Sequence, residues 1–224
     1  MRRMLLVAAL AVFWTGTASA EIDTDAGSRS VLFSFSGLSE LGAGSYDLGT
    51  TPSLPSGGEG TRLTTAGIGF RKFLANGLAI RPGLTLGFAS NKTEFDNREV
   101  TESGSAFGLS AVLEKHYHQP GARIAPYLGV GAGLGVASGS AKVDFKDGAF
   151  EDREDKSSGF GLGVFGALGF QAEVFDGANL GAEYRLGLAF NSGSIEPDGS
   201  DKIDTSSFGM GISTASFFLS VDLD

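Results

Sequence analysis

The sequence contains no cysteine, only two histidines and one tryptophan among its 224 residues. Without cysteine the chain can form neither a disulfide framework nor a thiolate metal site. Two histidines alone are one ligand short of an open catalytic zinc site. Proline is sparse, with six residues, and after residue 20 no run of about 18 apolar residues offers a transmembrane helix. Any integral membrane span after that point must therefore consist of strands.

Positive charge is also scarce, because 17 lysines and arginines face 26 acidic residues, giving a formal net charge of −9. Phosphate backbones are bound by basic patches, so this balance argues against nucleic acid as a partner. The acidic residues gather in polar stretches that could hold divalent cations, but no stretch has the spacing of a calcium-binding loop. We interpret these stretches as a solvated acidic surface and expect no metal and no cofactor.

Residues 1–20 have the three parts of a secretory signal peptide. Arg2 and Arg3 form a basic region, residues 4–14 form an apolar core, and small residues precede Glu21. An uncleaved membrane anchor would need a longer apolar run. We therefore predict a signal peptide at 1–20 whose cleavage site comprises Ala18, Ala20 and Glu21. A short amino-terminal periplasmic segment at 21–29 and one domain at 30–224 follow it.

Glycine is the residue in excess, with 35 copies, and it is concentrated in alternating runs. In Ile124–Ala137, IAPYLGVGAGLGVA, nearly every second residue is apolar and bulky, and the residues between are mostly glycine. A helix here would carry four interior glycines, each costing about 1 kcal/mol relative to alanine. A strand instead places the two sets on opposite faces. One face is then apolar and the other small, as expected if the small face lines a narrow interior.

The same alternation predicts eight strands, at about residues 30–38, 62–74, 78–90, 104–117, 124–137, 159–174, 180–191 and 205–221. Short turns at Asn76-Gly77, Pro120-Gly121 and Asp176-Gly177 alternate with longer polar loops at 39–60, 91–103, 138–158 and 192–204. The recurrence of an apolar face on nearly every strand favours a closed barrel over the alternative, a secreted β-sandwich. We predict an all-β fold, an eight-stranded antiparallel up-and-down transmembrane β-barrel, with its short turns in the periplasm.

Six charged residues fall on the strand faces that are predicted to point inward: Arg71, Arg81, Glu114, Glu173, Glu183 and Arg185. The interior of an eight-stranded barrel is just wide enough for side chains to fill it, and unpaired buried charge is costly. Three positive and three negative residues therefore predict an ionic network that plugs the barrel, with a gated or narrow polar channel as the alternative. The glycines of Ile124–Ala137 would make room for the arginines.

Two other patterns suggest chemistry. His116 could pair with Glu114 or Ser110 as a hydrolytic base and nucleophile, but this segment enters a predicted short turn, where we expect His116 and His118 to be solvated. Residues 161–166 match the dinucleotide-binding pattern G-x-G-x-x-G, yet they lie within a predicted strand rather than between a strand and a helix. We predict no catalytic residues and no enzymatic activity.

Three stretches resemble the outer-membrane β-barrel domain family of Gram-negative envelope proteins, often called the porin family. They are LFSFSGLSEL from Leu32, GIGFRKFLANGLAIRPGLTLGF from Gly67 and ARIAPYLGVGAGLG from Ala122. OmpX and the transmembrane domain of OmpA are similar small barrels. The resemblance covers about residues 30–221 and implies an integral outer-membrane protein with a structural or surface-interaction role. A narrow conduit for small solutes and a lipid A-modifying enzyme are the alternatives.

The resemblance also implies partners: outer-membrane lipid, lipopolysaccharide and, during biogenesis, the barrel-insertion machinery. Members of the family usually end in an aromatic residue that this machinery reads. The present chain differs, because it ends in Val221–Asp224, so the signal would lie in Phe217–Val221.

Overall fold

The computed structural model describes residues 22–35, 64–117, 122–146, 151–212 and 216–223. Within these residues no helix is long and apolar enough to span a membrane. The secondary structure consists of strands β1 (Arg29–Phe35), β2 (Thr64–Ala75), β3 (Leu78–Glu94), β4 (Arg98–His116), β5 (Ile124–Phe145), β6 (Arg153–Phe175), β7 (Ala178–Glu196), β8 (Ile203–Ile212) and β9 (Ser216–Asp222).

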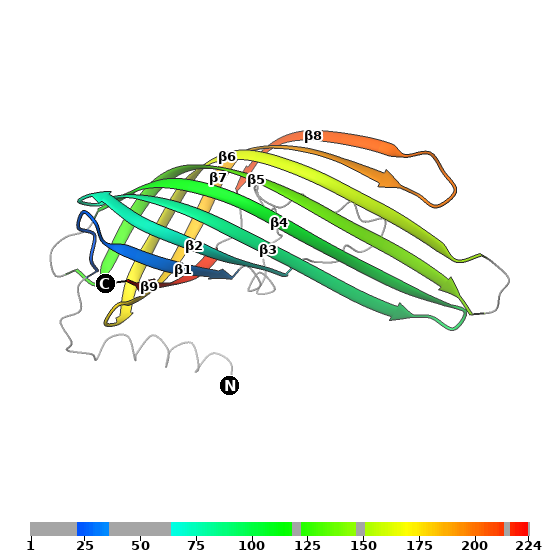
Figure 1. The fold of residues 1–224 in the computed structure, drawn as a ribbon, viewed down its shortest axis with the longest axis horizontal. Helices are drawn as coiled ribbons and strands as arrows, with labels where there is room; N and C mark the ends of the chain where they lie inside the picture. The colour runs from blue at the N-terminus through cyan, green and yellow to red at the C-terminus, as the bar shows by residue number, and fades with distance from the viewer. Residues whose placement is uncertain (1–21, 36–63, 118–121, 147–150, 213–215, 224) are drawn as a thin grey trace.

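Antiparallel pairing joins these strands into a ring (Figure 1). Each strand from β1 to β6 pairs with the next one along the chain. β9 closes the ring, because it pairs with β1 on one edge and with the first six residues of β7 on the other. β8 pairs with the later part of β7. β8 and β9 therefore share one position, and the ring has eight.

The predicted eighth strand, 205–221, was thus wrong as a single element. It is divided into β8 and β9 on either side of residues 213–215, which lie outside the described part of the chain. The sequence alternates poorly at this point, where Thr214 and Ser216 follow Ile212 in the set of otherwise apolar positions. The hydrogen-bonded ring nevertheless has the eight positions that the periodicity predicts.

The end of the molecule where β9 completes the ring also carries two tight turns, and we call it the closing end. Gly77 lies in the β2–β3 turn and Gly177 in the β6–β7 turn, with φ angles of +69° and +70°. These left-handed values are readily adopted only by glycine, as the Asn-Gly and Asp-Gly signals predict. The chain also ends here, because the Asp222 amide donates to the Gly177 carbonyl at 2.8 Å.

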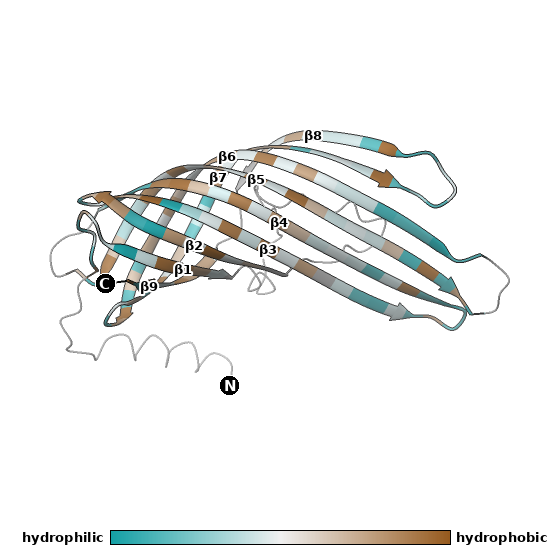
Figure 2. Cartoon of the chain, viewed as in Figure 1, coloured by the Kyte–Doolittle hydropathy of each residue, from teal (hydrophilic) through white to brown (hydrophobic). Residues whose placement is uncertain are grey.

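At the opposite end, which we call the extended end, strands replace most of the predicted loops. β3 and β4 are separated by only three residues, β5 and β6 run far into the stretch 138–158, and β7 runs to Glu196 in the stretch 192–204. The predictions of long loops at 91–103, 138–158 and 192–204 were therefore wrong over most of their length, and 39–60 lies outside the described residues. Figures 1 and 2 show β3 to β7 reaching this end, where the start of β6 is hydrophilic.

These extensions are polar strands. Because polar stretches are typical of loops, the sequence predicted loops where the structure has strands. Serine hydroxyls pair across the ladder, with Oγ–Oγ distances of 3.0 Å for Ser103 and Ser140 and 3.1 Å for Ser105 and Ser138. Such cross-strand pairs stabilise a sheet as apolar pairs do. Polarity therefore marks where the apolar belt ends rather than where the strand ends.

Toward the closing end the outer face of the ring is apolar and exposed and the inner face is buried, whereas residues 203–210 of β8 are exposed on both faces. Along β5 the two alternate residue by residue, so that Leu128 and Val130 are 49% and 64% exposed whereas Tyr127 is 0% exposed. A β-sandwich in water would bury its apolar face instead. This inside-out arrangement is the one that transmembrane barrels adopt.

Two glycines of Ile124–Ala137 make room for apolar side chains rather than for arginines, which corrects the prediction: Gly129 faces Val112 and Gly131 faces the Phe165 ring. Gly131 lies directly opposite Phe165 in the β5–β6 register, and a Cβ atom on Gly131 would lie 2.7 Å from the Phe165 ring. Two further glycine–aromatic pairs have the same arrangement, Gly169 opposite Tyr127 and Gly181 opposite Phe218. Each large ring thus lies over a position with no side chain of its own.

Replacing an interior glycine of this kind should destabilise the protein. In Gly181→Ala the new Cβ would overlap the Phe218 ring, and we expect the free energy of unfolding to fall by about 1–3 kcal/mol. The matched control is Gly166→Ala on the exposed outer face, where the nearest atom to the new Cβ is 3.8 Å away. Denaturant titration of the refolded protein in micelles measures both changes. Equal losses in the two variants would contradict the assignment of the faces.

Candidate functional site

Buried charged side chains from several strands meet inside the ring at the closing end. Arg71 on β2, Arg81 on β3, Glu114 on β4 and Glu183 on β7 are each 8% exposed or less. Their strands place them there because each occupies an inward position of the period-two pattern. We call these residues, together with Arg185 on β7, the ionic network.

Glu114 is the first of two carboxylates that organise the network. Its Oε2 accepts a hydrogen bond from Arg71 Nε at 2.7 Å and lies 3.0 Å from His116 Nε2. Its Oε1 lies 2.6 Å from Arg81 Nε in an ion pair. A single carboxylate on β4 therefore holds arginines from both β2 and β3.

Glu183 is the second carboxylate, and Arg81 connects it to the first. Arg81 Nη2 donates to Glu183 Oε2, which also accepts a hydrogen bond from Tyr127 Oη at 2.7 Å. Arg185 Nε donates to Glu183 Oε1 at 2.7 Å. Arg81 thus links β4 and β7, strands that are not neighbours in the ring, through the interior.

Aromatic rings lie over the guanidinium groups of the three arginines. The Arg71 guanidinium lies 5.6 Å from the centre of the Phe218 ring, and that of Arg81 lies 6.0 Å from it. The Arg185 guanidinium lies 4.5 Å from the centre of the Phe165 ring. Cation–π contacts of this kind favour the charged guanidinium where water is excluded.

Five of the six residues predicted to lie inside are in this network, and Glu173 is not. Glu173 is only partly buried near the end of β6, and the charges that act on it are those of Asp176 and Arg123, outside the network. The β6–β7 register shifts between Glu173 and Phe175, so the regular inward alternation ends there. The network therefore contains three arginines and two carboxylates.

His116 is the residue that the sequence interpretation placed wrongly. It was expected to be solvated, but its side chain is 0% exposed. Its ring stacks on Tyr127 at a centroid distance of 4.9 Å and meets the edge of Phe73 at 5.0 Å. The signal was present, since residue 116 shares the inward parity of Glu114. His118 lies outside the described residues.

Three other members of the site were missed because they carry no charge: Tyr127, Gln171 and Phe218. Gln171 Oε1 accepts a hydrogen bond from Arg71 Nη1 at 2.6 Å. The inward parity of the strands would have found Tyr127 and Gln171. It would not have found Phe218, because three large apolar residues follow one another at Phe217–Leu219 and hide the alternation.

Of the two chemical patterns in the sequence, the first is formed only in part, because His116 contacts Glu114 at 3.0 Å but not Ser110. Ser110 and His116 lie on one strand six residues apart, which separates them by about 20 Å, too far for a nucleophile and its base. The G-x-G-x-x-G stretch lies in the middle of β6 and precedes no helix. Among the described residues no group of three histidine, aspartate or glutamate side chains could hold a metal ion.

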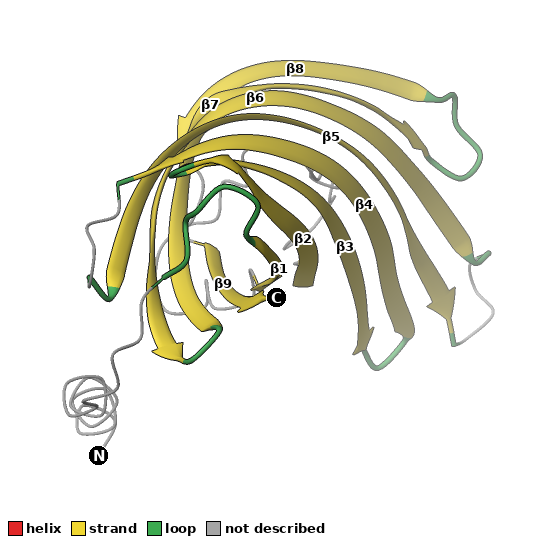
Figure 3. Ribbon diagram, turned by 60° about the vertical axis from the view of Figure 1, so that its left-hand side comes forward, coloured by secondary structure: helices red, strands yellow, loops and turns green. Residues whose placement is uncertain are grey.

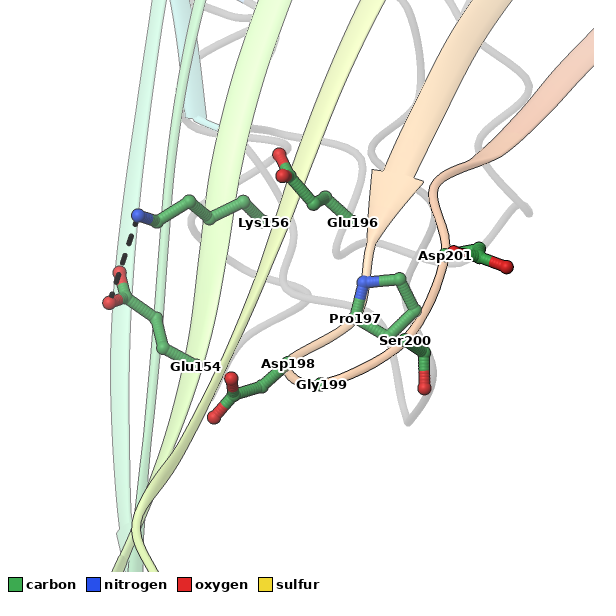
Figure 4. A pocket seen from close by; sticks show the side chains of 8 residues that line it. All are labelled: Glu154, Lys156, Glu196, Pro197, Asp198, Gly199, Ser200 and Asp201. Atoms are coloured by element: carbon green, nitrogen blue, oxygen red, sulfur yellow. Dashed lines mark ion pairs between the residues drawn. The ribbon is translucent and has the colours of Figure 1, made fainter.

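A second concave region lies at the extended end, between the start of β6 and the β7–β8 connection (Figure 4). It is an open hollow of about 730 Å³ lined by Glu154, Lys156 and residues 196–201. Lys156 Nζ lies 4.0 Å from Glu154, and the Asp198 amide donates to Asp155 Oδ1 at 3.0 Å. Most of the charged side chains that line the hollow are exposed to solvent.

Removing one carboxylate from the ionic network should be strongly destabilising. In Glu114→Gln, Arg71 and Arg81 lose the charge that offsets their burial, and we expect the free energy of unfolding to fall by about 3–5 kcal/mol. The same substitution at Glu173, outside the network, should change it by less than about 0.5 kcal/mol. Denaturant unfolding of both variants measures the difference. Similar values for the two would show that Glu114 does not hold buried charge.

The sequence matches no family model and no curated protein, whereas the fold is similar to that of solved structures. The crystal structure of a major outer membrane protein from Thermus thermophilus is similar with a TM-score of 0.53. The similarity covers 88% of this chain and 100% of that chain, at 10% sequence identity. Such a likeness shows the fold alone. The chain therefore has an outer-membrane-protein-like, barrel-like β structure with a buried ionic network.

Proposed function

We propose that the protein is an integral outer-membrane β-barrel with a structural or surface-interaction role, and that it is not an enzyme. One observation carries the proposal: a ring with an apolar outer face is filled at one end by paired charges and aromatic rings. An exposed apolar belt suits hydrocarbon, and paired charges suit an interior that fills rather than conducts. Outer-membrane lipid and lipopolysaccharide are then the permanent partners of the outer face, and the barrel-insertion machinery acts during biogenesis.

The likeness to an outer-membrane protein supports this location, and the distribution of polar residues supports an orientation. The closing end, with its tight turns, would face the periplasm, and the extended end would face outward. The described residues of the stretches 91–105, 139–158 and 192–204 include thirteen acidic and seven basic side chains. The surface shown to the medium would therefore be acidic and would favour cationic partners.

A narrow conduit for small solutes is the alternative. A conduit requires a continuous polar path past Arg81, Glu114 and Glu183, whose mutual contacts occupy the closing end. Lipid A modification is less well supported, because Ser110 and His116 are too far apart to act together.

Planar-bilayer recordings separate the plugged barrel from the conduit. We expect the purified protein, reconstituted without denaturant, to show no steady openings, because Arg81 joins Glu114 and Glu183 across the interior. The control is Arg81→Ala, which removes this link and should give transient openings if the variant folds. Steady openings of the unmodified protein would contradict the plugged barrel and favour the conduit.

A further inference from the structure

Residues at the rim of the closing end are buried although they lie at the very ends of their strands. Ala79 is the second residue of β3 and Ala125 the second of β5, and both are 0% exposed. His116, the last residue of β4, is 3% exposed. The rim of an uncovered barrel mouth would be in contact with water, so the chain must cover this end.

The segment that precedes β1, Ile22–Ser28, is attached to this rim by backbone hydrogen bonds. The Phe73 amide donates to the Ser28 carbonyl, and the Gly27 amide donates to the Phe73 carbonyl, both at 2.9 Å. The Gly77 amide donates to the Thr24 carbonyl at 2.9 Å. The Gly77 carbonyl in turn accepts from the His116 amide at 2.7 Å, which connects the segment to the end of β4.

The segment has a defined conformation of its own. Ile22 is 2% exposed and Thr24 is 9% exposed, whereas the alternating residues Asp23 and Asp25 are exposed. Asp23 Oδ1 accepts from the Asp25 amide at 2.8 Å, and Oδ2 accepts from Ser28 Oγ at 2.7 Å. An aspartate that bonds to groups two and five residues later holds the chain in a turn. Alternating burial shows that one side of the segment faces the protein.

We propose that Ile22–Ser28 is a lid that seals the closing end and keeps water from the base of the ionic network. Figure 3 shows this segment in green inside the curve of the strands, just before β1. The lid covers the end at which Phe73 and His116 lie, and His116 contacts Glu114. Exclusion of water strengthens the ion pairs of the network, because charges interact more strongly in a low dielectric. The lid goes beyond the proposed function, since it can seal this end in a plugged barrel or close one end of a conduit.

The absence of cysteine allows a direct test with one engineered thiol. Ala79→Cys places a small reporter at the rim, and its rate of reaction with a water-soluble maleimide is measured in the refolded mature protein. We expect slow labelling with the native lid. Adding Ile22→Asp, which puts a charge at a buried lid position, should raise the rate about tenfold or more by opening the lid locally.

The matched control is Ala26→Asp, which introduces the same charge at an exposed position of the same segment and should leave the labelling rate unchanged. The compact band on an unboiled gel verifies that each variant is folded. If Ile22→Asp does not fold, Asp23→Ala is used in its place, because it removes the hydrogen bonds that hold the turn. Fast labelling with the native lid would overturn the proposal. Equal labelling rates of Ala79→Cys in folded protein carrying Ile22→Asp and in folded protein carrying Ala26→Asp would also overturn it.

Discussion

The structure depends on one constraint, which is that a sheet with an apolar outer face must satisfy its own backbone hydrogen bonds. Every strand from β1 to β7 has a neighbour on both sides over part of its length, and β9 completes the ring by pairing with β1 and β7. In hydrocarbon no water would be present to replace a missing pair. Closure in turn fixes the interior, because inward side chains from all sides must then fill one narrow space.

The interior fills that space in two ways, and both depend on the register of the strands. Large rings lie opposite glycines, as Phe165 does opposite Gly131, so that bulk on one strand is matched by its absence on the next. Charges lie next to opposite charges, and Arg81 reaches carboxylates on two strands that are not adjacent. A shift of one residue in any of these registers would turn the whole inward set toward the outside.

The sequence contains most of this fold because a period of two is a strong signal over strands as long as β5. It predicts the eight positions of the ring and the inward face of Arg71, Arg81, Glu114, Glu183 and Arg185. It does not predict where the strands end, because charged and polar strand segments such as the first residues of β4 have the composition of loops. For His116 the period gives the inward parity but not the environment, because the rings that pack on His116, Phe73 and Tyr127, lie on other strands.

We propose that the barrel spans the outer membrane with its extended end outside and its closing end in the periplasm. Thiol labelling of intact cells tests it, because the native chain has no cysteine. Ser200→Cys lies in the β7–β8 connection and Asn76→Cys in the β2–β3 turn, and both positions are exposed. We expect an impermeant maleimide to label Ser200→Cys in intact cells and to label Asn76→Cys only after the outer membrane is broken. Labelling of both, of neither, or of Asn76→Cys alone in intact cells would contradict it.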